Sequence, residues 1–164
     1  MTISATHVTA VDGLAELAHQ VRASTLELSH VPVPNWLTWS PAGTSNHILW
    51  HAGHAVWLQD ALTICPLTGR SELPRGWATI FGQNSRPELN TEWPEVTEVR
   101  ILLQNQITRI ESLLREHAAT ILAEANAIPP SGGWPLLPGM IHGWHDEARH
   151  QGEMYLLHKL LRAV

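Results

Sequence analysis

The sequence predicts an all-α protein, a four-helix bundle with a long loop between its second and third helices. Four segments have the pattern of helices, and in the first and third of them apolar residues recur at three- and four-residue steps, the spacing that places side chains on one face of a helix. No segment shows sustained period-two alternation of β-branched residues, so we expect no β-sheet. The chain has 164 residues, enough to bury a substantial core, and we assign residues 1–164 to a single domain.

The first two helices have recognisable ends. The first is expected from about Val8 to His30, where two prolines follow. The second is expected to start at Thr44 or Ser45, both good N-cap residues, and to end near Thr63. The apolar stripe of the first helix comprises Leu14, Leu17, Val21 and Leu28.

A region rich in proline and glycine, residues 66–93, separates the second helix from the third. It either lies over a functional site or simply spans the length of the bundle with short turns of its own. The third helix is expected from near Thr91 to near Ala125, with apolar residues repeating through about seven turns. The fourth is expected to begin after Pro138 and Gly139 and to end near Arg162.

Composition excludes some function classes. The formal net charge is −5, with only 10 Lys and Arg residues and no basic cluster, which opposes nucleic-acid binding. No apolar stretch approaches the ~20 residues of a membrane span, and the first twenty residues lack the pattern of a signal peptide. We therefore expect a cytoplasmic protein without a membrane partner. The single cysteine, Cys65, excludes an intrachain disulfide.

Histidines are concentrated in the second helix. The stretch HILWHAGH, residues 47–54, places His47, His51 and His54 at i, i+4 and i+7, the spacing of one helix face. Either these imidazoles line a metal site, or the helix carries a polar face for a plainer structural reason.

The fourth helix carries a second polar stripe. His142, Asp146 and His150 are spaced i, i+4 and i+8, Glu153 continues the stripe, and His145 lies about one-quarter turn away. Zinc and nickel bind neutral imidazole and carboxylate, so three or more ligands converge if this stripe meets that of the second helix. The alternative is a set of core histidines satisfied by hydrogen bonds, as a lone buried histidine usually is.

Two motifs resemble the DinB/YfiT-like superfamily. They are NHILWHAGH in the second helix and DEARHQGEMYLL in the last, and the resemblance covers essentially the whole chain. It implies an up-down-down-up four-helix bundle that holds nickel or zinc with three histidines, one on the second helix and an H-x-x-x-H pair on the last. Carried over, His51 and His150 match two ligands, and the third position holds Asp146 instead of histidine.

The resemblance thus implies a divalent metal site, zinc or nickel, formed by His51, Asp146 and His150. Alternatively Asp146 orients a histidine, and one of four other imidazoles completes the shell. Glu153 is expected to act as a general base, or else to pair with Arg149. The four other imidazoles are His47, His54, His142 and His145.

The superfamily includes thiol-dependent transferases and isomerases. The resemblance therefore implies a metal-dependent enzyme that acts on a small molecule, either a thiol-dependent S-transferase with a low-molecular-weight thiol as partner or a hydrolase. Low charge and family habit favour a homodimer. The alternative is a non-enzymatic dimeric binding or stress-response bundle whose metal site is vestigial.

Overall fold

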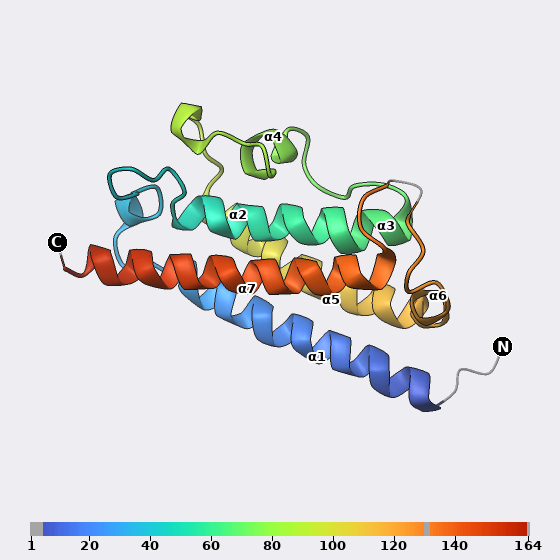
Figure 1. Ribbon diagram of the computed structural model, residues 1–164. Helices are drawn as coiled ribbons and strands as arrows, with labels where there is room; N and C mark the ends of the chain where they lie inside the picture. Colours follow the sequence, from blue (N-terminus) through green and yellow to red (C-terminus); the bar gives the residue numbers. More distant parts are fainter. Residues whose placement is uncertain (1–4, 130–131, 164) are drawn as a thin grey trace.

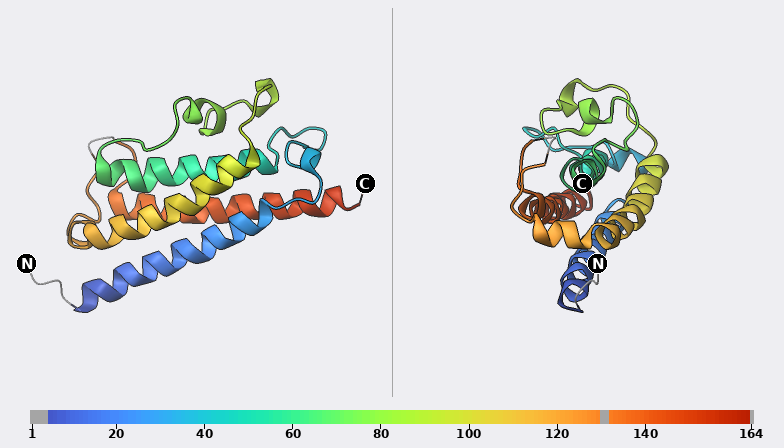
Figure 2. Two further views of the ribbon diagram at one scale, coloured as in Figure 1. Left: turned by 180° about the vertical axis from the view of Figure 1, so that it is seen from behind. Right: turned by 90° about the vertical axis from the view of Figure 1, so that its right-hand side faces the viewer.

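The computed structural model describes residues 5–129 and 132–163, which form a bundle of four long helices (Figure 1). These helices are α1 (Ala5–Leu28), α2 (Ile48–Gln59), α5 (Val96–Glu116) and α7 (Leu136–Leu161). Helices α1 and α7 run in one direction and α2 and α5 in the other (Figures 1 and 2). Along the bundle axis, α5 and α7 lie on either side, between α2 and α1 (Figure 2, right). The described residues contain no strand, and the predicted all-α class is confirmed.

The core has two apolar clusters separated by a buried polar layer. One cluster includes Leu103 of α5 and Met154 of α7, and the other includes Ile110 of α5 and Trp144 of α7. Between them along α5 and α7 lie polar side chains that are almost fully buried, among them Gln106 and Glu147. Burying each large apolar side chain contributes about 1.5–3 kcal/mol, so these two clusters provide the main stabilisation of the bundle.

Helix α2 begins later than predicted. Its N-cap is His47, not Thr44 or Ser45, and Nδ1 of His47 accepts a hydrogen bond from the Trp50 N–H at 3.1 Å. The imidazole thus satisfies a free amide of the first turn, as a serine or threonine oxygen would. Beyond Gln59 the helix continues into a π-helical turn and then α3, and it ends at Gly69 in the left-handed conformation (φ 77°). The π-helical turn spans Asp60–Ile64, and α3 spans Cys65–Thr68.

Two other helices also depart from prediction. The third predicted helix starts only at Val96 and breaks at His117, after which α6 (Ala118–Ala123) follows. Helix α7 starts at Leu136, before Pro138 and Gly139. Proline is tolerated there because the first-turn amides have no partner within the helix. The loop before α7 includes residues 130–131, which lie outside the described residues.

The buried face of α1 differs from the predicted stripe. Leu17 is 38% exposed, whereas polar residues occupy the interior instead. The other three predicted residues, Leu14, Val21 and Leu28, are partly buried and pack against the core clusters, so the predicted stripe lies at the edge of the buried face. The centre of that face is a neighbouring stripe, whose polar residues find partners on other helices. The buried residues of α1 are Val11, Ala18, Arg22 and Thr25, followed by Ser29.

The region between α3 and α5 forms short elements and packs on α2. Its helix α4 (Trp77–Phe81) lies over α2, where Trp77 Nε1 donates to the Gly53 carbonyl at 3.1 Å (Figure 1). Gly53 is required by this packing, because a Cβ there would overlap the Phe81 ring. The two remaining short elements are 3-10 turns at Pro34–Trp36 and Pro87–Leu89. None of the described helices has the combined length and apolarity to cross a membrane.

Candidate metal centre

The histidine faces of α2 and α7 meet where the two helices pack together. Nδ1 of His51 lies 2.9 Å from Nδ1 of His150, and the His54 and His150 rings are 4.7 Å apart. His51 is 1% exposed and His54 is 5% exposed, so both imidazoles are removed from bulk water. The structure therefore brings together imidazoles that are almost one hundred residues apart in the chain.

Two groups of three side chains in this cluster could hold a metal ion, and they share His150. In the first, His51 and Glu153 join it; in the second, His54 and Asp146 do. Within each group the ligand atoms lie within 4.8 Å of one another. Of the residues predicted as ligands, His51 and Asp146 both approach His150, but they fall in different groups.

Hydrogen bonding defines which nitrogen of His54 is available. Its Nδ1 lies 2.7 Å from the Phe81 carbonyl oxygen, which can only accept a hydrogen bond. Nδ1 therefore carries the proton, and the lone pair is on Nε2. The ring also stacks on Trp50, with centroids 4.7 Å apart, and this contact restricts its rotation. An imidazole held by a backbone carbonyl in this way is typical of a metal ligand.

A chain of contacts orients His150 as well. Nε2 of His51 lies 3.3 Å from a Glu153 carboxylate oxygen, so the tautomer with its proton on Nε2 places that N–H toward the negative oxygen and is favoured over a lone pair there. Nδ1 of His51 is then the acceptor in the short contact with Nδ1–H of His150. Nε2 of His150 consequently carries a lone pair and faces Asp146, whose carboxylate oxygen is 3.7 Å away.

Burial keeps the imidazoles neutral. It lowers the pKa of His51 to about 2, with further lowering by the neighbouring His150, His54 and His47. Burial also lowers the pKa of His150 to about 4, and lowers that of His54. Neutral imidazole is the form that coordinates a metal, so protons compete little with a cation at neutral pH.

The two carboxylates differ in their surroundings. Asp146 is partly buried and accepts a hydrogen bond from Arg149 Nη1 at 2.9 Å. Arg149 thus pairs with Asp146 rather than with Glu153. The Glu153 side chain is 54% exposed, and partial burial raises its pKa, an effect that Arg149 opposes. A carboxylate with a raised pKa beside a buried imidazole is suited to accept and release a proton.

The other histidines considered as ligands lie elsewhere. His47 caps α2, and its ring meets Trp93 edge-on, with centroids 4.4 Å apart. His142 stacks on Trp134, and His145 is exposed. None of the three belongs to either group of potential ligands among the described residues.

An open pocket of about 440 Å³ adjoins the cluster. His51 and Glu153 form part of its wall, and the segment before α2 and the last turns of α7 form the rest. Leucines of α7 make one side apolar, whereas Thr44, Ser45 and Asn46 make the other polar. A small amphipathic molecule can therefore reach the His51–Glu153 pair from solvent.

Sequence reasoning missed a buried polar network in the middle of the bundle. Arg22 of α1 donates to Gln106 of α5 and to Glu147 of α7, both at 3.1 Å. Glu147 also accepts from Thr25 Oγ1 at 2.7 Å and from Gln59 Nε2 at 3.4 Å. The only signal in the sequence was polar residues at helical spacing on α1, which is equally typical of a solvent-facing stripe.

The fold is an all-helical bundle, and the site is a buried histidine and carboxylate cluster of the kind that holds a divalent metal ion. A family model of the DinB superfamily matches residues 17–154. The match spans most of the sequence, and the chain belongs to the DinB superfamily. The search of curated proteins found no match.

Proposed function

We propose that the chain is a divalent-metal-dependent enzyme that acts on a small molecule at the His150 cluster. The observation that supports this proposal is the convergence of two potential ligand groups on one imidazole, in a site where hydrogen bonds already orient the rings. Burial also keeps His51 and His150 neutral, which is the form of imidazole that coordinates a metal ion.

The proposed ligands are His150 and Asp146 with a second imidazole, either His51 or His54. The donor set suits zinc or nickel, which bind neutral nitrogen and carboxylate oxygen. His54 is favoured by its hydrogen bond to Phe81, which leaves Nε2 free. In that case His51 lies between Glu153 and His150 and contacts both. Such a chain of contacts orients the coordinating imidazole of His150 and raises the basicity of that imidazole.

When bound, the ion would lower the pKa of a coordinated water or thiol and polarise an electrophile. The chain's own residues would supply the proton transfers. Glu153 lines the pocket beside His51, so it is the proposed general base. His51, buried and neutral, would hold that carboxylate in place.

The pocket supports a substrate that is small and partly apolar. The proposed reaction is a thiol-dependent S-transfer, with a low-molecular-weight thiol as co-substrate, or a hydrolysis. We further propose a cytoplasmic homodimer without a nucleic-acid or membrane partner. The proposed topology is the up-down-down-up bundle of the superfamily, which the opposite directions of the helix pairs support (Figure 1).

Metal analysis of untagged protein tests this proposal. A tag is avoided because nickel from a column can occupy an empty histidine site. We expect stoichiometric zinc or nickel in the native protein and its loss in His150→Ala, whereas the exposed His145→Ala variant retains it. Comparing His51→Ala with His54→Ala identifies the third ligand, since only its loss lowers the metal content to the His150→Ala level.

The opposite result would favour a non-enzymatic binding bundle. If the native protein carries under ~0.1 metal ion per chain and added zinc leaves its thermal stability unchanged, the site is vestigial.

A further inference from the structure

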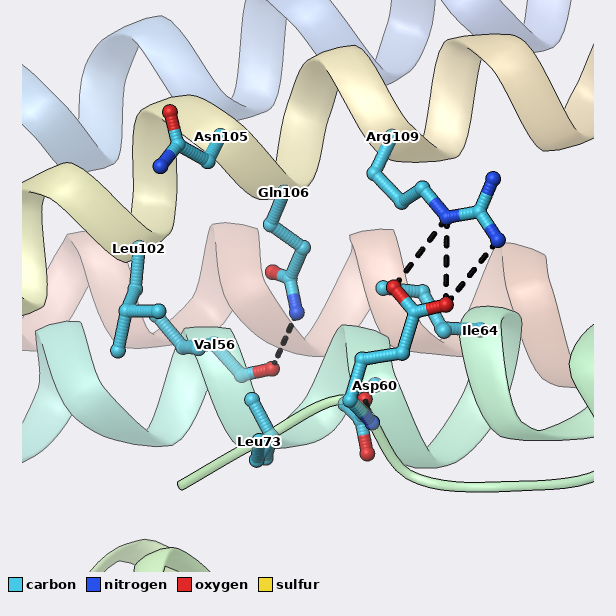
Figure 3. Close-up of a pocket in the computed structure, with 9 residues that line it drawn as sticks. Val56, Asp60, Ile64, Leu73, Leu102, Asn105, Gln106 and Arg109 are labelled. Carbon is cyan, nitrogen blue, oxygen red and sulfur yellow. Dashed lines mark hydrogen bonds and ion pairs between the residues drawn. The ribbon is translucent and has the colours of Figure 1, made fainter.

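A second pocket lies on the side of the bundle where α2, α5 and the segment after α3 meet (Figure 3). Its volume is about 200 Å³. Val56 and Ile64, together with Leu73 and Leu102, give it apolar walls. A dry engineered cavity of ~150 Å³ holds benzene, so this pocket can hold one ring with a short substituent. It shares no lining residue with the metal centre.

Asp60 is an unusual residue in this wall. It is 3% exposed, and no Lys, Arg or His nitrogen of the described residues lies within 4 Å of its carboxylate. One of its oxygens, Oδ1, accepts the Glu72 backbone N–H at 2.9 Å. Burial raises the pKa of Asp60, while bonds from Ser71 and from that N–H oppose the rise. Burying a carboxylate without a cationic partner costs free energy, and a cationic ligand bound beside Asp60 would offset that cost.

The other charged groups of the pocket satisfy each other. Arg109 of α5 forks onto the Glu72 carboxylate, with Nε and Nη2 donating at 3.0–3.3 Å (Figure 3). Gln106 donates to the Val56 carbonyl at 2.8 Å and accepts from Arg22, so its amide is engaged as well. Among the described charged groups that line the pocket, Asp60 is therefore the one without a partner of opposite charge.

The backbone at Asp60 is also irregular. The residue opens the π-helical turn Asp60–Ile64, where the regular hydrogen bonding of α2 is interrupted. Such single π turns are rare and are frequent at functional sites. The turn thus coincides with the buried carboxylate and with the pocket.

We propose that this pocket binds a small organic cation, a primary amine with a compact apolar body whose ammonium group pairs with Asp60. The apolar walls enclose the body of the ligand, and the ammonium donates charge-assisted hydrogen bonds to the carboxylate. This inference does not depend on the proposed enzyme activity, because the two sites are separate.

Amide chemical-shift titration of the full-length protein with three isosteric probes tests the proposal. The probes are benzylamine, benzyl alcohol and benzoate. We expect benzylamine to give saturable shifts at Leu73, Leu102 and Gln106, with weaker binding of the alcohol and weakest binding of benzoate. In Asp60→Asn, whose amide oxygen can still accept the Glu72 N–H, benzylamine affinity falls at least about tenfold and approaches that of benzyl alcohol.

The controls separate this pocket from the metal centre. Asp146→Asn removes a carboxylate from the other site and leaves benzylamine binding unchanged. Leu102→Trp fills the pocket with Asp60 intact and abolishes the shifts, so the test does not rest on one variant. Equal affinity of amine and alcohol, an unchanged affinity in Asp60→Asn, or shifts confined to the neighbourhood of His51 would each overturn the proposal.

Discussion

Removing Glu147 is expected to destabilise the protein more than removing Arg22. The two side chains are 0% and 1% exposed, and they pair at 3.1 Å in the polar layer of the core. In Glu147→Leu the guanidinium stays buried without a counter-ion, and it cannot lose its proton at any ordinary pH. Nε and Nη1 of Arg22 have no hydrogen-bond partner among the described residues even in the native protein. Loss of one partner of a buried pair costs about 3–5 kcal/mol, a large fraction of the stability of a typical domain.

In the reverse variant, Arg22→Met, the buried charge that remains can be neutralised, which is not possible in Glu147→Leu. Burial raises the pKa of Glu147, and without the guanidinium, which lowers it, the carboxyl can become neutral. Thr25 and Gln59 still contact its oxygens. We therefore expect Arg22→Met to lower the free energy of unfolding by about 1–3 kcal/mol, the cost of a buried polar group that lacks part of its hydrogen bonding.

Urea unfolding, monitored by circular dichroism, measures the loss of unfolding free energy in both single variants. The double variant completes the double-mutant cycle. Replacing a whole buried ion pair by apolar residues is often neutral or stabilising, so Arg22→Met/Glu147→Leu should be less destabilised than Glu147→Leu alone. If Arg22→Met is the more damaging single change, or if the two losses simply add, the reasoning from an uncompensated guanidinium is wrong.

Three further results are expected. Gly53→Ala forces the Phe81 ring away, which should lower the free energy of unfolding in urea by about 1–3 kcal/mol. The same variant should bind zinc more weakly, because the Phe81 carbonyl orients His54. Unchanged zinc affinity would show that the position of Phe81 does not affect the metal centre. Burial lowers the pKa of His47 to about 4, so on acidification the imidazole of the unfolded chain is protonated before that of the folded protein. The free energy of unfolding that His47 contributes is therefore complete near pH 7, and it falls by about 3 kcal/mol as the pH drops from ~6.5 to ~4. His47→Asn keeps an N-cap oxygen and should make that part of the stability curve of the metal-free protein less steep, while His51, His54 and His150 keep their share of the slope. An identical curve would refute this assignment. Zinc at a hundred times its Kd should raise the free energy of unfolding by about 2.7 kcal/mol in the native protein and by nothing in His150→Ala, as thermal denaturation can show.

Local periodicity carried much of the fold prediction. The repeats around Leu103 and Ile110 predicted a helix packed in a bundle, and α5 has that apolar face buried. Apolar spacing works as a predictor because a helix must bury one stripe, whatever it packs against. Helix ends were predicted less well. His47 caps α2 through a ring nitrogen, whereas residue preferences predict serine or threonine at an N-cap. The helix break at His117 is not marked by a proline or glycine in the sequence.

For the site, the sequence alone identified which side chains could take part. Spacing placed His51 and His54 on one helix face, and His150 with Asp146 and Glu153 on another, because the helical repeat relates residues within one helix. It could not determine the register between α2 and α7. That register puts His150 of α7 against both His51 and His54 of α2, and so divides the potential ligands into two groups.

Only the tertiary structure decided which polar residues are buried and how they are compensated. Arg22 looks like a surface residue in the sequence, and it is interior because Glu147, Gln106 and Thr25 arrive from other parts of the chain. Asp60 becomes a buried carboxylate only where α5 and the segment after α3 close over a π-helical turn. Burial, and with it the pKa and chemistry of a charged group, depends on neighbours that are distant in sequence, whereas helical periodicity depends on neighbours three and four residues away.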